Sequence, residues 1–480
     1  MKQLTVYILG FTSLFLFNTC ARNPVTGKKQ VVFMSEAQEI QMGQEADPQI
    51  IAQYGLYDDN ALQAFMKEKG KAMAAISHRP NIEYNFRIVD SEVLNAFAVP
   101  GGYVYFTRGI MAYLNDEAQF AGVLGHEIGH IAARHTVAQQ RNQILGQLGI
   151  IAGVVLAPDL ARFAETASQG LGLLLLKFGR EAETQADELG VEYSTKINYD
   201  AKEMADFFLT LKRQSASQSA ELPTFLSTHP DPGNRYTTVN KLAAEWKAKL
   251  GVKNPVIARN EYLKRIDGMV FGEDPRQGYL ENDVFYHPGL KFQFSVPQGW
   301  NYQNTPQRVQ VAPKDGKALM FMTLAKGTTP EEAATTTLQA FGLQATESKK
   351  VFINGLPALR VYAAPAQQQQ GQEIRTVSTF IQYGGKIYLM LGVSSYTDFT
   401  TYQPYFLQSM QNFRELTDLS KINKKPQRVR TKTVNSASTL EQSLKSFGVP
   451  AAKMEEMAVL NGMQLTTKLS AGTLIKVVSE

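Results

Sequence analysis

Residues 122–135 have the sequence GVLGHEIGHIAARH, and this stretch decides how the chain around it must fold. It holds three of the six histidines, and His126 and His130 bracket a glutamate as H-E-x-x-H. Residues four apart on an α-helix are offset by about 40° and share a face. Both histidines can therefore hold one metal ion, and Glu127 lies where a general base could act on an attacking water. The alternative is a helix with two ordinary core histidines.

His135 is a tempting further ligand, but its position along the helix argues against that role. It follows His126 by nine residues, which places it about 180° away on a continuing helix. It also fails the spacing of the longer motif H-E-x-x-H-x-x-G-x-x-H. We expect His135 to have a structural or surface position.

The stretch REAETQADELG, residues 180–190, offers the third ligand that a catalytic zinc site needs. Glu183 and Asp187 are four apart in a helical pattern, so they share one face. Glu183 can bind the metal while Asp187 orients a ligand histidine. Glu181 lies about 200° from Glu183 on the helix, so only one of these two glutamates can face the metal. The alternative is an exposed acidic helix face.

The stretch RIVDSEVLNAFAVPGGYVYFTRG, residues 87–109, interrupts a mostly helical region that extends from about 36 to 250. Its alternating pattern around a Pro-Gly-Gly turn predicts a hairpin or paired edge strands. A helix that carries H-E-x-x-H should then start at the cap residue Asn115. We expect Asn95, Ala96 and Phe97 to form an exposed strand near the cleft, where extended substrate adds to the sheet edge. The alternative is a purely structural hairpin.

Together these segments resemble metallopeptidase family 48, the HtpX-, BepA- and CAAX-prenyl-protease-like zinc metallopeptidases. The resemblance rests on H-E-x-x-H followed by E-x-x-x-D, on NAFAVPGGYVYFTRG (95–109) and on STHPDPGNR (227–235), and it covers roughly residues 20–275. It implies a zincin-type endopeptidase of envelope proteins with one zinc ion. The implied ligands are His126, His130 and Glu183, and the implied catalyst is Glu127.

The same resemblance places His229 at the cleft. Three positions remain open for it: the surface, a donor to the oxyanion of the transition state, or a fourth zinc ligand that silences the enzyme. Arg235 follows six residues later. It could contact substrate, steady the loop or lie on the surface.

The N-terminal segment MKQLTVYILGFTSLFLFNTC predicts a secretory signal that is too short to span a membrane. Cys20 is the only cysteine, and its place resembles that of the lipidated residue of a bacterial lipoprotein. CARNPVTGKKQ (20–30) resembles the start of the lipoprotein branch of the family. We therefore expect a periplasm-facing lipoprotein of the bacterial outer membrane. The alternative is a chance cysteine in a signal or anchor segment.

The overall composition is that of a globular multidomain chain, with 44% hydrophobic and 19% charged residues among 480. The net charge of +5 is small for this length and gives no reason to expect nucleic acid as a partner. Apolar runs at 144–157 and 171–178 predict buried helices beside the site or, alternatively, a flap that faces a membrane or partner.

Composition shifts along the chain predict its organisation. We expect a signal peptide (1–20), a mainly α zincin-type peptidase domain with a small β-sheet edge (21–262), a linker (263–280), an α+β accessory domain (281–418), a basic linker (419–432) and a small βααβ LysM-like module (433–480).

The LysM-like resemblance rests on Thr439-Leu440, on LNG at 460–462 and on LSAGTLIKVV at 469–478. Modules of that kind bind peptidoglycan-type glycans, so the resemblance implies an envelope partner. Ala437-Ser438 replaces the usual Gly-Asp, which weakens the case for glycan affinity more than the case for the fold.

The function expected from the whole chain is zinc-dependent hydrolysis of peptide bonds in envelope proteins, especially misfolded or misassembled ones. The rival interpretation is a chaperone-like or cell-wall-binding lipoprotein scaffold with a latent protease site. The intact Glu127 favours the enzyme, because a scaffold does not need the base.

Overall fold

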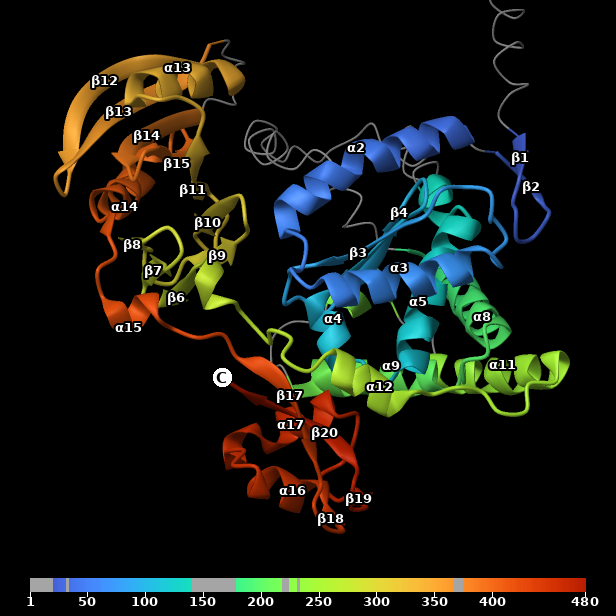
Figure 1. The fold of residues 1–480 in the computed structure, drawn as a ribbon. Helices are drawn as coiled ribbons and strands as arrows, with labels where there is room; N and C mark the ends of the chain where they lie inside the picture. The colour runs from blue at the N-terminus through green and yellow to red at the C-terminus, as the bar shows by residue number, and fades with distance from the viewer. Residues whose placement is uncertain (1–19, 32–33, 140–177, 218–223, 231–233, 367–373) are drawn as a thin grey trace, which may run out of the picture.

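The structure is a computed structural model that describes residues 20–31, 34–139, 178–217, 224–230, 234–366 and 374–480 (Figure 1). The expected signal segment before Cys20 lies outside the described residues. So do the apolar run at 144–157 and all of the run at 171–178 except Phe178. Among the residues described, no helix combines the length and apolar character needed to cross a membrane.

The N-terminal region is mainly helical and carries a small three-stranded sheet (Figure 1). Its helices are α2 (Glu36–Tyr54), α3 (Asn60–Ala74), α4 (Arg108–Tyr113), α5 (Glu117–Ala132), α8 (Arg180–Lys196), α9 (Glu203–Ser217), α10 (Thr224–Thr228), α11 (Arg235–Leu250) and α12 (Arg259–Arg265). Helix α5 carries the H-E-x-x-H motif. Its cap is Asp116, whose carboxylate accepts from the Gln119 amide, so the helix starts one residue later than the cap Asn115 predicted.

The sheet has the order β3 (Asn85–Val89), β5 (Tyr103–Thr107), β4 (Ala96–Val99), so β4 is an edge strand among the described residues. Strands β4 and β5 are antiparallel and joined at Gly101 and Gly102, whose φ values of 81° and 99° suit only glycine. The predicted hairpin is therefore confirmed.

The expectation of an exposed strand at the start of β4 is wrong for the side chains. Asn95, Ala96 and Phe97 are all buried. The reason is that β4 packs against α5 on one face, while the Phe97 ring stacks on Tyr105 on the other, with 4.9 Å between ring centroids. Only the backbone edge that faces away from β5 lacks a partner strand among the described residues.

The second region is β-rich and contains two sheets. A four-stranded sheet has the order β16 (Arg414–Glu415), β8 (Phe292–Ser295), β7 (Val284–His287), β6 (Tyr279–Glu281). A seven-stranded antiparallel sheet has the order β12 (Leu343–Ile353), β13 (Leu356–Pro365), β14 (Ile374–Tyr383), β15 (Lys386–Ser395), β11 (Ala318–Ala325), β10 (Arg308–Ala312), β9 (Asn301–Asn304).

Two helices cover opposite faces of the larger sheet: α13 (Pro330–Ala340) and α14 (Phe399–Gln411). Along β11, Phe321 packs in the cluster under α13, whereas Met320 and Met322 pack in the cluster under α14. This alternation is the two-residue period of a strand that is buried on both sides.

The C-terminal unit consists of two antiparallel strand pairs around two short helices. Strand β17 (Arg428–Thr433) pairs with β20 (Leu474–Ser479), and β18 (Ser438–Thr439) pairs with β19 (Lys468–Leu469). The helices α16 (Leu440–Ser446) and α17 (Met454–Leu460) lie between them in the chain. Because β17 begins at Arg428, this unit starts five residues before the predicted boundary at 433.

Both segments predicted as linkers contact neighbouring elements of the fold. In the basic segment 419–432, Lys421 and Lys424 both pair with Glu281 of β6. In the segment 263–280, Leu263 and Val270 are buried, and Val270 forms a β-bridge with Arg428. Two of the basic residues in 419–432 thus form intramolecular ion pairs.

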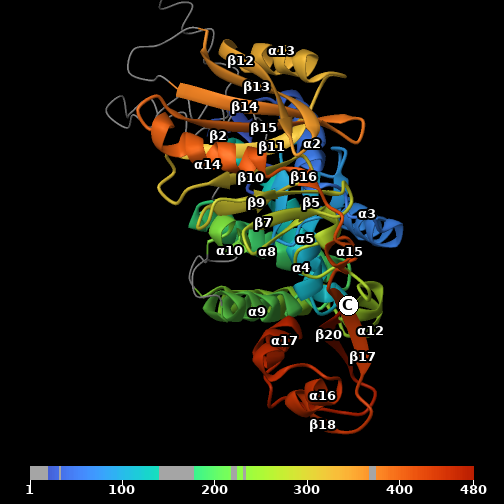
Figure 2. The same cartoon turned by 90° about the vertical axis from the view of Figure 1, so that its left-hand side faces the viewer.

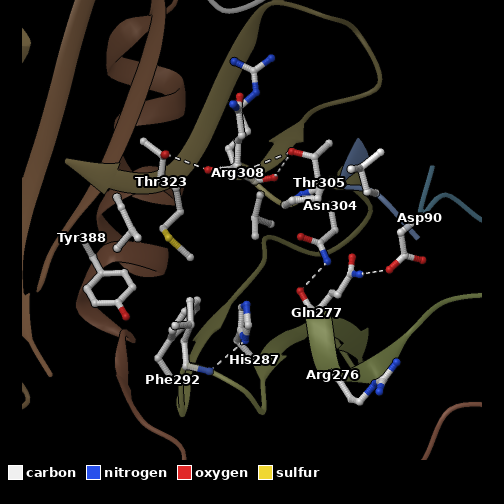
Figure 3. Close-up of a pocket in the computed structure, with 18 residues that line it drawn as sticks. Asp90, Arg276, Gln277, His287, Phe292, Asn304, Thr305, Arg308, Thr323 and Tyr388 are labelled. Atoms are coloured by element: carbon white, nitrogen blue, oxygen red, sulfur yellow. Dashed lines mark hydrogen bonds between the residues drawn. The ribbon is translucent and has the colours of Figure 1, made fainter. Parts of the chain in front are cut away.

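A cavity of about 640 Å³ lies between the N-terminal region and the β-rich region (Figure 3). On one side it is lined by Leu56 and Asp90, and on the other by His287, Phe292 and Tyr388. None of the residues of the H-E-x-x-H stretch lines it. This cavity is therefore separate from the candidate site.

Candidate metal centre

Three glycines let helices α5 and α8 approach closely at the candidate site. A Cβ atom added to Gly125 would lie 3.0 Å from the Gly190 Cα, and one added to Gly129 would lie 3.0 Å from the Leu189 Cβ. One added to Gly190 would lie 3.1 Å from the His126 backbone nitrogen. Side chains at these positions would push the helices apart. The close packing brings α8 side chains onto the histidines of α5.

Four buried residues place one ligand atom each within 4.8 Å of one another: His126, His130, Glu183 and His229. The His126 Nε2 lies 3.0 Å from the His130 Nε2 and 3.2 Å from the His229 Nδ1. A Glu183 Oε1 lies 3.0 Å from the His229 Nδ1 and 3.5 Å from the His130 Nε2. In a tetrahedral zinc site, bonds of about 2.0–2.1 Å put neighbouring ligand atoms about 3.3 Å apart. The four distances given above, from 3.0 to 3.5 Å, lie close to that spacing.

Buried carboxylate oxygens near the cluster indicate that a cation belongs there. Glu127 is fully buried, and neither of its oxygens, nor the Glu183 Oε2, accepts a hydrogen bond from any described residue. Burial raises the pKa of Glu127. Burial, followed by the nearby His126, holds the pKa of His130 well below its usual range and keeps it neutral, as a ligand must be. Nitrogen and carboxylate donors in this number fit zinc.

Asp187 holds the ring of His126 in one orientation. The His126 Nδ1 donates to the Asp187 Oδ1 at 2.9 Å, which leaves the Nε2 lone pair directed into the cluster. Asp187 lies one helical turn after Glu183 on α8, and both are buried, while Glu181 is exposed. The angular offset predicted this separation of the two glutamates.

Arg235 lies behind Asp187, and each nitrogen of its guanidinium donates a hydrogen bond. Its Nε and one terminal nitrogen donate to the two Asp187 oxygens at 2.8 and 2.5 Å. The other terminal nitrogen donates to the His229 carbonyl at 3.4 Å. The guanidinium also lies over the Phe208 ring, 3.9 Å from its centroid. Of the three positions considered for Arg235, the surface is wrong, and these contacts favour steadying the loop.

His229 is buried inside the cluster, so a surface position for it is also wrong. Its ring stacks on Phe225 of α10, with 4.6 Å between centroids. Its Nδ1 faces Glu183 and His126, and its Nε2 lies 3.7 Å from the Glu127 Oε1. The ring therefore contacts both the proposed ligands and the proposed base.

The prediction that His135 lies on the opposite face of the helix is wrong, because α5 ends at Ala132. Arg134 adopts a left-handed conformation with a φ of 57°, and the chain turns back beside the cluster. The His135 Nδ1 lies 2.9 Å from the His130 Nδ1, and its Nε2 lies 2.9 Å from the Gln185 Oε1. Because the amide oxygen accepts from Nε2, His135 accepts the Nδ1 proton of His130. The Nε2 of His130 is then free to bind a metal.

Sequence reasoning missed two supports of His130: Gln185, which fixes His135, and Phe178, whose ring stacks on His130 at 4.0 Å between centroids. Phe178 ends the apolar stretch LGLLLLKF, whose composition indicated burial but not this contact. Glycines 122, 125 and 129, at helical spacing, were the available signal for the close approach of a second helix.

Comparisons with known proteins agree with this geometry. Residues 60–243 match the model of Peptidase family M48. The beta-barrel assembly-enhancing protease of Escherichia coli strain K12 is 28% identical over 222 residues, 45% of each chain. That of Yersinia pestis is 28% identical over 266 residues, 52% of each chain. The mitochondrial metalloendopeptidase OMA1 of Arabidopsis thaliana is 29% identical over 179 residues, 37% of this chain and 35% of that one.

The chain spans about half the length of the beta-barrel assembly-enhancing proteases it matches. Among solved structures, cyanobacterial PsbP from Synechocystis covers 28% of the chain with 9% identity and a TM-score of 0.23, too low to support an argument. The matched segment contains the H-E-x-x-H helix, Glu183 and His229. The similarity to Peptidase family M48 is thus confined to residues 60–243, the segment that carries the candidate metal centre.

Proposed function

We propose that the chain is a zinc-dependent endopeptidase. The observation that supports this most strongly is the fully buried Glu127, whose carboxylate accepts no hydrogen bond from the described residues and lies beside a cluster of four potential ligands. His126, His130 and Glu183 would hold the zinc. When bound, zinc polarises a peptide carbonyl and makes water acidic enough to ionise near neutral pH.

The residues of the chain supply the proton transfers and the orientation. Glu127 takes a proton from the attacking water and passes it to the leaving amine. Burial raises its pKa, which brings this carboxylate closer to the pH at which a proton is both accepted and released. Asp187 and His135 hold the Nδ1 protons of the two motif histidines, so both Nε2 atoms stay directed at the metal.

Two observations support protein substrates: the protease relatives, and the edge of β4 that has no partner strand among the described residues. An extended peptide could add to this edge by backbone hydrogen bonds, next to the strand that packs against α5. The backbone at Asn95, Ala96 and Phe97 would bind it, since their side chains face inward. The relatives named beta-barrel assembly-enhancing proteases support envelope proteins, especially misfolded or misassembled ones, as the substrates here.

Metal content and hydrolysis test this proposal together. Protein that lacks residues 1–20 should carry about one zinc and degrade casein, and a chelator should stop the degradation until zinc is restored. Glu183→Ala should lose the metal, whereas Glu181→Ala, the matched exposed glutamate, should keep it. Asp187→Ala should weaken zinc binding by roughly 10- to 100-fold.

Equal zinc loss in the Glu183 and Glu181 variants would contradict the ligand assignment. Zinc uptake without cleavage of any unfolded protein, even after the cluster is opened by His229→Ala, would favour the rival scaffold function. In that case the C-terminal unit, whose two helices between paired strands support a LysM-like fold, would become the main functional element.

An envelope location with an acyl anchor at Cys20 accompanies the proposed activity. Asn23, three residues after Cys20, donates from Nδ2 to the Ala133 carbonyl at the end of α5. An acyl chain on Cys20 would thus hold the metal centre close to a membrane surface. Cys20→Ser should move the protein from the membrane fraction to the soluble fraction, as measured by fractionation. Retention in the membrane would contradict the anchor.

A further inference from the structure

A buried lysine joins the C-terminal unit to the peptidase domain. Lys476 of β20 has no exposed surface, and its Nζ donates to the carbonyls of Ala112 at 2.7 Å, Leu114 at 2.9 Å and Tyr113 at 3.4 Å. These carbonyls belong to the end of α4 and to the link that leads into α5. The two ends of the contact are more than 360 residues apart in the chain.

The chemistry of both groups explains the contact. The last carbonyls of a helix have no partners within the helix and carry partial negative charge. An ammonium has three N–H donors, and here each finds one carbonyl. Burial lowers the pKa of Lys476, and the nearby Asp116 opposes that effect. A lysine buried without such acceptors would be strongly unfavourable, so this contact specifies how the unit docks.

Further polar contacts hold the same interface. Arg213 of α9 donates to the Met463 carbonyl at 2.7 Å and to Glu455 at 2.8 Å. Within the C-terminal unit, the Asn461 side chain accepts from the Lys476 amide and donates to the Lys476 carbonyl, both within 2.8 Å, which fixes the backbone that carries the lysine. A Cβ atom at Gly462 would lie 3.0 Å from the Asn115 side chain.

The hydrophobic core is also shared. One continuous cluster includes Leu440, Leu460 and Ile475 of the C-terminal unit together with Phe120 and Leu124 of α5. Figures 1 and 2 both place the unit against α9 and α12. A module that served only as a tether would not share a core with the enzyme.

Lys476 binds the carbonyls of residues 112–114, which lead directly into the start of α5. Within this link, the Asn115 amide donates to the Gln119 side chain, and the Asn115 carbonyl accepts from Arg259 at 3.2 Å. Asp116 then caps α5, and burial raises its pKa to about 6. His126 follows ten residues later, about 15 Å along the helix. Because a helix moves as a rigid element, a displaced start displaces the histidines.

We propose that Lys476 is a positioning residue for the H-E-x-x-H helix, and that the C-terminal unit, residues 428–480, is a structural part of the peptidase. Its effect on hydrolysis rests on the proposed function, whereas its effect on the backbone of α5 does not.

The test uses the zinc-loaded chain that lacks only residues 1–20, and it compares Lys476→Met with wild type well below the unfolding temperature. Met keeps the length of the stem but has no donor, so the carbonyls of Ala112 and Leu114 lose this partner, while that of Tyr113 keeps only its hydrogen bond from the Asn115 side chain. Hydrogen exchange should become roughly 10-fold faster or more at the amides of Leu114, Gln119 and Phe120. Zinc affinity, measured against a competing chelator, should fall by roughly 10-fold. The kcat for casein should fall similarly with little change in KM.

Lys468→Met is the matched control, because Lys468 is an exposed lysine of the same unit. It should leave all three measurements unchanged. If Lys476→Met does not fold, Arg213→Gln loosens the same interface without leaving a buried carbonyl cluster unpaired. It should change exchange, zinc affinity and kcat in the same direction by a smaller factor.

Unchanged exchange at the start of α5 in a folded Lys476→Met protein, with wild-type zinc affinity, would overturn the proposal. Faster exchange and weaker zinc binding in a chain whose wild type cleaves no protein would support the positioning role and contradict the proposed function instead. A uniform rise in exchange across α5, α8 and the β-rich region would indicate global destabilisation and would also overturn it.

Discussion

Glu127→Gln should retain zinc and lose hydrolysis by roughly 100- to 10,000-fold, the contribution of a general base. The substitution leaves all four ligand residues in place and keeps the volume of the buried side chain, so the cluster should still form. An amide cannot take the proton of the attacking water. The measurement is casein cleavage by variant and wild type at equal zinc content.

Glu188→Gln is the control, because Glu188 is an exposed carboxylate on α8 and takes no part in the cluster. It should cleave casein at the wild-type rate. Cleavage by Glu127→Gln at a rate close to wild type would contradict the assignment of Glu127 as the general base. Loss of zinc in the variant would show instead that Glu127 holds the metal.

His229→Ala should raise casein turnover, by roughly 10-fold or more, while zinc remains bound. The His229 Nδ1 lies 3.0 Å from Glu183 and 3.2 Å from the His126 Nε2, the separation expected of ligands on one tetrahedral ion. A catalytic zinc site needs one open position, and an imidazole in that position excludes water and substrate. The alanine variant opens it.

The direction of the change separates the two roles left for His229. If the imidazole instead donates to the oxyanion, His229→Ala should lower kcat by roughly 100-fold or more. An unchanged rate with unchanged zinc content would remove His229 from both roles. His287→Ala, a histidine substitution in the separate β-rich region, should leave the rate at the wild-type value.

Local periodicity was enough to predict the parts of the site that lie on regular elements. The helical offsets placed His126 beside His130 and separated Glu183 from Glu181, because both pairs lie inside uninterrupted helices. The hairpin of β4 and β5 followed from alternation around two glycines. These features depend on neighbours within a few residues, which a single sequence displays.

The predictions that were wrong concern features that depend on side chains distant in the sequence. Nothing between Ala132 and His135 marks a helix end locally. The left-handed turn at Arg134 is held by Glu39 of α2, whose carboxylate accepts from the Arg134 Nε at 3.0 Å. The same reasoning applies to the basic segment 419–432, because two of its lysines, Lys421 and Lys424, pair with Glu281 of β6. Tertiary contacts of this kind override local patterns.

Because the N-terminal region and the C-terminal unit share one hydrophobic core, the chain must complete its folding in a particular order. The carbonyl of Ala112 meets its partner 364 positions later, and contacts of such large sequence separation form late and slowly during folding. A ribosome that has made the complete H-E-x-x-H helix has therefore not yet made the strand that completes the link before it. The peptidase would acquire its final shape only after residue 476 has been synthesised, by which time the β-rich region has also emerged.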